Sequence, residues 1–80
     1  MTVVVYSTPN CVYCSMLKQF LKENHVIFEE VDVSEDDSGA DRLFEISGQY
    51  AVPVTFFDAK HVIIGFDKKA LVECIKELNL

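Results

Sequence analysis

The sequence of 80 residues predicts one α/β domain, residues 1–80, in which a four-stranded mixed sheet carries helices on both faces. Short apolar runs alternate with segments whose apolar residues recur at helical spacing, in the order β-α-β-α-β-β-α. The first two runs and the helix between them span about 30 residues, the size of a βαβ unit, so their strands are expected to be parallel. Only residues 58–61 separate the last two runs, and a connection this short requires an antiparallel pair.

The first half of the chain holds the expected βαβ unit. Residues 3–6 form a strand that is apolar throughout, as is typical of strands buried on both faces. Asn10 is the expected N-cap of a helix over about 11–23, which closes with polar residues. Residues 26–33 form the second strand, in which valines alternate with an aspartate near the end.

The second half begins with another helix, expected over about 40–47. One of three polar residues can cap it: Asp36, Asp37 or Ser38. Gly48 suits the end of this helix, because glycine readily adopts the left-handed conformation found there. Residues 54–57 and 62–64 then form the antiparallel pair on either side of the short connector.

The last helix begins after its expected N-cap, Asp67, and Phe66 just before it can pack onto Leu71. Its apolar stripe includes Cys74, which we expect to be a small core residue rather than a reactive thiol. His61, in the connector of the preceding strand pair, is expected to be exposed. Neither Cys74 nor His61 is therefore assigned a chemical role.

Composition and charge restrict the classes of function. Hydrophobic residues make up 50% of the chain, which is enough for a packed core without disulfide bonds to hold it. The net charge of −6 disfavours nucleic acid and anionic membrane surfaces as partners. No apolar run approaches the length of a membrane span. Six acids between Glu29 and Asp37, with no base among them, are interpreted as a solvated strand end and loop.

The number of cysteines bears on the cellular compartment in which the protein acts. Three cysteines, an odd number, argue against a secreted framework of disulfides. The chain begins with a strand rather than with the pattern of a secretory signal. We therefore expect a cytoplasmic protein, acting as a monomer, in which a cysteine pair is kept mostly reduced.

Cys11 and Cys14 carry the chemistry that the sequence predicts. They lie where the first strand passes through a polar turn into the first helix. Residues i and i+3 of a helix have Cβ atoms roughly 5–6 Å apart, so a small adjustment lets the pair form a disulfide. The helix N-terminus favours a thiolate, which is the form that attacks disulfides. The pair is therefore interpreted as a redox switch.

The two cysteines are expected to differ in accessibility. Cys14 shares a helix face with Leu17 and Leu21 that points to the core, whereas Cys11 lies at the open end of the helix. Cys11 is then the exposed nucleophile and Cys14 the shielded resolving thiol. One alternative is a pair of unreactive core cysteines. Another is half of a zinc site, but zinc takes four ligands and the remaining cysteine and histidines are not paired along the chain, so no metal is expected.

Three segments resemble the glutaredoxin family, a small version of the thioredoxin fold, and the resemblance as a whole extends over nearly the whole chain. Residues 11–18, CVYCSMLK, resemble the CPYCxxxK pattern, with Val in place of Pro. Residues 47–53, SGQYAVP, resemble the TGQxTVP segment that carries the family's cis-proline. Residues 65–67, GFD, stand where the family has a Gly-Gly turn that opens the last helix.

The resemblance implies a disulfide reductase with a dithiol mechanism. Cys11 would attack a disulfide, and Cys14 would resolve the mixed disulfide. The substrates would be disulfide-containing proteins or glutathione mixed disulfides, with ribonucleotide reductase among the candidates. No cofactor would be bound, and either glutathione or a thioredoxin-reductase-type flavoenzyme would restore the dithiol.

The resemblance also implies a site for the substrate or for glutathione around the two cysteines. It would comprise eight residues: Thr8, Tyr13, Gln49, Val52, Pro53, Gly65, Phe66 and Asp67. Pro53 would be cis and face the cysteines, Val52 would pair its backbone with the bound thiol substrate, and Gln49 would touch the glycine carboxylate of glutathione. The backbone of residues 65–67 would hold the γ-glutamyl end. Lys18 would support the thiolate electrostatically.

Two departures from the family pattern leave the electron donor open. Thr8 stands where many glutaredoxins have a lysine that pairs with a glutathione carboxylate. The Gly65–Phe66 turn also resembles the small redoxins that serve ribonucleotide reductase and take electrons from thioredoxin reductase.

Two other classes of function compete with the reductase. One is a homodimer that holds an iron–sulfur cluster through Cys11 and glutathione, which Tyr13, in place of a small residue, disfavours. The other is a passive redox sensor or interaction protein, which turnover in a disulfide-reduction assay would exclude.

Overall fold

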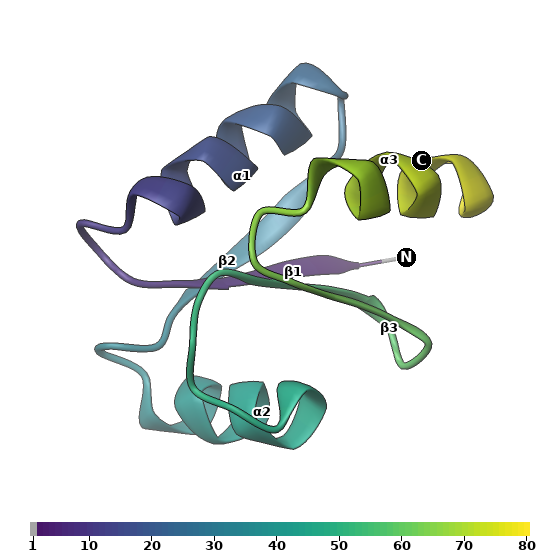
Figure 1. The fold of residues 1–80 in the computed structure, drawn as a ribbon. Coiled ribbons are helices and arrows are strands. Elements are labelled where there is room, and N and C mark those ends of the chain that lie inside the picture. The colour runs from purple at the N-terminus through teal and green to yellow at the C-terminus, as the bar shows by residue number, and fades with distance from the viewer. Residues whose placement is uncertain (1) are drawn as a thin grey trace.

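The computed structural model describes residues 2–80 and arranges them in three layers. The strands are β1 (Val3–Ser7), β2 (Phe28–Asp32), β3 (Val54–Asp58) and β4 (His61–Ile64). The helices are α1 (Val12–Glu23), α2 (Asp37–Ser47) and α3 (Lys68–Glu77). Helices α1 and α3 cover one face of the sheet and α2 covers the other (Figure 1). None of these helices has the length and apolarity that crossing a membrane requires.

The four strands form one mixed sheet in the order β2-β1-β3-β4. Strand β1 runs parallel to β2 and antiparallel to β3, and β3 runs antiparallel to β4. The predicted element order, the mixed sheet and the helices on both faces are therefore confirmed.

The core has two parts because side chains along a strand alternate between the faces of the sheet. In β1, Val3 and Val5 pack toward α1 and α3, whereas Tyr6 packs toward α2. The first cluster holds ten buried residues: Val3, Val5, Leu17, Phe20, Leu21, Val26, Phe57, Leu71, Cys74 and Ile75. Burial of each leucine contributes about 1.5–3 kcal/mol. This cluster fixes α1, and with it the two cysteines, on the sheet.

The predicted N-cap of α1 is wrong. Asn10 has a φ of 61°, in the left-handed region, whereas an N-cap residue has extended backbone. Cys11 has that extended backbone, with φ −103° and ψ 109°, and it caps the helix. Asn10 instead makes the left-handed turn that leads into the cap.

The other cap residues follow the prediction, although α2 starts at Asp37, before the expected start near residue 40. Asp36 caps α2 by accepting a hydrogen bond from the N–H of Gly39, and Asp67 caps α3 through the N–H of Ala70. Gly48 ends α2 in the left-handed conformation, with φ 76°. Strand β2 is shorter than the predicted 26–33, because Val26 belongs to the core beneath α1 instead of the ladder.

His61 is not exposed, contrary to the prediction. Its Nδ1 lies 2.8 Å from Asp58 Oδ1 and its Nε2 lies 3.3 Å from Glu77 Oε2. The hydrogen bond with Asp58 is the main cause that raises the pKa of His61 above its ordinary value. The imidazole thus links the β3–β4 hairpin to α3. Cys74 is buried in the core as predicted, and burial raises the pKa of its thiol.

Candidate redox site

The two cysteines sit at the junction of β1 and α1. A disulfide joins Cys11 to Cys14, and their Cα atoms are 5.2 Å apart, within the usual range for such a bond. Cys14 is only 1% exposed, as predicted, whereas Cys11 is half-buried and not exposed as predicted. This is the order of accessibility that an attacking Cys11 and a resolving Cys14 require.

The helix N-terminus acts directly on the Cys11 sulfur. As the N-cap, Cys11 places its Sγ 3.2 Å from the backbone nitrogen of Cys14, which donates a hydrogen bond to it. The first turn of α1 contains no acidic residue that would oppose a negative sulfur. A hydrogen bond from such an N–H and the dipole at a helix N-terminus both favour the thiolate form of a cysteine.

The loop before β3 carries a cis Val52–Pro53 bond, as predicted. Because Tyr6 pairs with Val54 in the ladder, Pro53 lies beside Ser7, the last residue of β1. The cysteine-bearing turn starts from Ser7, so the cis-proline loop and that turn share one end of the sheet. Val52 is half-buried and its side chain packs on the α2 side of the core.

The turn before α3 is joined to this loop. Gly65, with φ 80°, donates its N–H to the carbonyl oxygen of Pro53 at 2.8 Å. The ring of Phe66 packs edge-to-face against Phe20, with centroids 6.0 Å apart, and the Asp67 carboxylate caps α3. The side chains of Phe66 and Asp67 therefore serve the fold, and binding of a ligand by the backbone of this turn stays a prediction.

The remaining predicted site residues lie near the surface. Tyr13 is 63% exposed, and Thr8 and Gln49 are half-buried. Gln49 is held through its backbone, which exchanges hydrogen bonds with the Ser47 hydroxyl at the end of α2. Contact of these three residues with glutathione stays a prediction.

Lys18 contacts a carboxylate that the sequence analysis did not single out. Its Nζ lies 2.6 Å from Glu30 Oε2 on β2, and the Ser7 hydroxyl donates a hydrogen bond to the same oxygen at 3.2 Å. The Lys18 hydrogen bond is the main cause that lowers the pKa of Glu30, with its charge and Ser7 adding to it against burial. Glu30 comes two residues after the inward-facing Phe28, so strand alternation could have indicated that it faces α1.

Metal ligands are not grouped in residues 2–80: no three His, Cys, Asp or Glu side chains lie together so as to hold an ion. The two cysteines of one chain alone do not supply the ligands of a cluster.

The fold and the site define a class. A thioredoxin-like fold with a disulfide-capable cysteine pair at the first helix N-terminus is the architecture of thiol–disulfide redox proteins. A family profile described as Glutaredoxin matches residues 3–62. The chain belongs to the glutaredoxin family, and its close cysteine pair indicates thiol–disulfide oxidoreduction.

Individual relatives agree with this assignment. A glutaredoxin-like protein of Clostridium pasteurianum is 32% identical over 75 residues, which are 94% of this chain and 99% of the other. The glutaredoxin-like protein NrdH of Lactococcus lactis is 36% identical over 65% of this chain and 71% of its own. The crystal structure of the thioredoxin-like protein BC3987 superimposes with a TM-score of 0.82 at 35% identity, covering 89% of this chain and 96% of the other.

Proposed function

We propose that this protein is a disulfide reductase that works through a dithiol mechanism. The Cys11 thiolate attacks a substrate disulfide, forming a Cys11–substrate bond while the other substrate sulfur leaves as a thiolate and takes up a proton. Cys14 then loses its proton and attacks the Cys11 sulfur, which releases the second substrate thiol. The substrate gains two electrons and two protons, and the protein is left with its Cys11–Cys14 bond.

The observation that carries this proposal is the difference between two cysteines that are close enough to bond. Cys11 receives a hydrogen bond from the helix N-terminus, and it is the more exposed residue of the two. Cys14 is nearly fully buried and held at 5.2 Å between Cα atoms, so it is protected from outside disulfides but poised for Cys11.

The electron donor is proposed to be glutathione, used less well than by members with a lysine at the position of Thr8. The turn at residues 65–67, tied to Pro53, supports a backbone site for the γ-glutamyl carboxylate. The neutral Thr8 supplies no charge for the other carboxylate, and the net charge of −6 adds a mild repulsion at low salt. A thioredoxin-reductase-type flavoenzyme is the alternative donor.

The test compares the two donors on one disulfide substrate. NADPH oxidation is followed with glutathione and glutathione reductase in one arm and with thioredoxin reductase in the other. Turnover in either arm that disappears in Cys11→Ser supports the reductase. No turnover in either arm with a folded, reduced protein would overturn the proposed reductase function. Turnover in the thioredoxin reductase arm alone would show that the flavoenzyme, and not glutathione, is the donor.

A further inference from the structure

A small polar cluster lies between α1 and the edge of the sheet next to the cysteines. Lys18 and Ser7 both donate to one oxygen of Glu30, at 2.6 and 3.2 Å. Ser7 is 1% exposed, and the Lys18 side chain is 24% exposed despite its charge. The lysine is therefore held in place rather than free in solvent.

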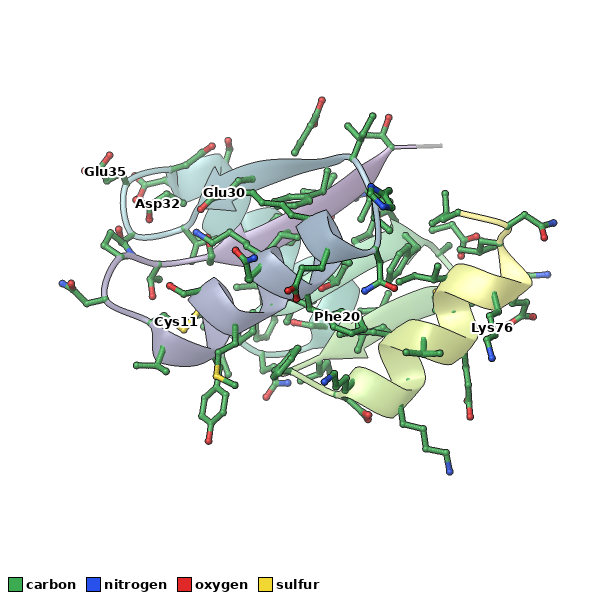
Figure 2. All side chains as sticks on the ribbon, turned by 90° about the horizontal axis from the view of Figure 1, so that it is seen from above. Cys11, Phe20, Glu30, Asp32, Glu35 and Lys76 are labelled. Carbon is green, nitrogen blue, oxygen red and sulfur yellow. A yellow bond between two sulfur atoms is a disulfide. The ribbon has the colours of Figure 1, made fainter. Side chains whose placement is uncertain are left out.

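This cluster is adjacent to the redox pair. Lys18 follows Cys14 by four residues, one turn along the same side of α1, at the border of its buried face. Ser7 is the last residue of β1, from which the turn to Cys11 begins. In Figure 2, Cys11 and Glu30 lie at the same end of the molecule, and Lys76 lies at the opposite end.

We propose that Glu30 is a positioning residue which holds the Lys18 ammonium on β2 and thereby sets the reduction potential of the Cys11–Cys14 pair. This inference rests on the proposed function and adds the regulation of its redox equilibrium. The carboxylate limits the positive field that Lys18 exerts on a thiolate, both by pairing with the ammonium and by its own negative charge.

The sign of the effect follows from electrostatics. A positive charge near the reduced pair stabilises the thiolate, and so favours the dithiol state over the disulfide. Removing the Glu30 charge should therefore make the protein more oxidising, and removing the Lys18 charge should make it more reducing. Lys22, the other base of α1 that acts on Glu30, is unchanged in both cases.

The experiment compares Glu30→Gln, Lys18→Gln and the double variant with the native protein in dithiothreitol redox buffers. In each equilibrium one dithiothreitol is oxidised to its cyclic disulfide. Its two electrons pass to Cys11 and Cys14, whose sulfur–sulfur bond breaks. One thiol proton passes to Cys14 and the other to the buffer, because Cys11 is a thiolate at the working pH. The reduced fraction is counted by alkylation and mass spectrometry at a pH above the Cys11 pKa, where the thiolate is fully formed.

We expect the equilibrium constant to shift about threefold toward the dithiol in Glu30→Gln and about threefold toward the disulfide in Lys18→Gln, as for a partly screened charge. Threefold corresponds to ~14 mV at 29.6 mV per tenfold. The double variant should return close to the native value. High salt should shrink both shifts.

The matched control is Glu29→Gln. Glu29 precedes Glu30 on the same strand and loses the same charge, but its side chain points to the opposite face of the sheet. It should leave the equilibrium constant nearly unchanged. A shift equal to that of Glu30→Gln would mean that overall charge, and not the cluster, sets the potential.

The opposite signs of the two shifts in reduction potential distinguish the proposed electrostatic role from a purely structural role of the ion pair. Both single variants break the same ion pair, so the free energy of unfolding measured in urea should fall by a similar amount in each. Shifts of the potential in the same direction, or none, would overturn the inference while leaving the reductase intact. A native protein that does not equilibrate with dithiothreitol at all would instead overturn the proposed function.

Discussion

Gly65 donates its backbone N–H to the carbonyl oxygen of Pro53 at 2.8 Å. This bond joins the turn before α3 to the cis-proline loop. Both lie at the end of the sheet where β1 ends and the cysteine-bearing turn begins. Gly65 has a φ of 80° and an added Cβ would meet no atom within 4 Å, so only the backbone conformation opposes a side chain there.

Gly65→Ala should therefore destabilise the protein by about 1–2 kcal/mol, the cost of the left-handed conformation for a residue with a Cβ. It should also reduce disulfide-reductase turnover, because the strained turn lies at the proposed substrate site. Urea unfolding and turnover are measured on the same preparations. Gly48→Ala is the control: Gly48 has a φ of 76° and equal space, but it ends α2. Equal losses of turnover in both variants would contradict a special role of the Gly65 turn.

Cys11 should be the only fast-reacting thiol of the reduced protein. Its sulfur accepts the helix N-terminal hydrogen bond, so its pKa should lie below the ordinary value of about 8.5. Cys74 is buried and its pKa is raised, so it should stay unmodified. Brief alkylation at mildly acidic pH followed by peptide mapping gives the order of labelling. Label found first on Cys14 or Cys74 would reverse the assignment.

Cys14→Ser should keep activity on glutathione mixed disulfides and lose it on protein disulfides. The first reaction needs one attacking thiol and free glutathione, whereas the second needs a resolving thiol in the protein. Cys74→Ala, which also removes a buried thiol, should retain both activities. Equal loss in the two assays would argue against separate roles for Cys11 and Cys14.

Stability should fall as pH rises through the folded-state pKa of His61. That pKa is raised above the ordinary 6.5, chiefly by the hydrogen bond with Asp58, so the stabilisation is complete below pH 6.5 and is lost above the raised value. The lowered pKa of Asp58 acts at the other end: its contribution is present above pH 3.8 and is lost in more acidic solution. The urea midpoint of the native protein should fall as the pH rises above 6.5 through the raised pKa of His61. The midpoint of His61→Gln should not show this fall. The same decline in both would exclude His61 as its source.

Thr8→Lys should improve glutathione-dependent turnover by up to about fivefold, since an exposed charge pair contributes about 0–1 kcal/mol. Thr2→Lys adds the same charge at the opposite end of β1, where it should have little effect. Steady-state rates at limiting glutathione provide the comparison. No gain from Thr8→Lys would remove the argument that a missing lysine limits glutathione use.

Sequence patterns were sufficient for the fold because its signals are local. The apolar runs, the cap at Asp67 and the stop at Gly48 are each read within a few residues, and the short 58–61 connector determines the antiparallel pair. The N-cap prediction for α1 failed, because Asn10 is a favoured N-cap type and Cys11 is not. Only the left-handed backbone of Asn10 shifts the cap to Cys11.

Contacts between distant segments could not be predicted in the same way. Lys18 meets Glu30 only because the register of β2 against β1 places Glu30 opposite Val5, beneath α1. His61 meets Glu77 only because α3 packs back along the hairpin. Such pairs depend on packing angles and register that no single stretch of residues encodes.

The measurement that tests the central claim most directly is the position of the trapped mixed disulfide. Cys14→Ser is incubated with glutathione disulfide, quenched with acid, and mapped by mass spectrometry without reduction. One glutathione per chain, attached to Cys11, is the predicted result, because the attacking thiol holds the substrate when no resolving thiol remains. An adduct on Cys74, or no adduct on a folded protein, would contradict the account.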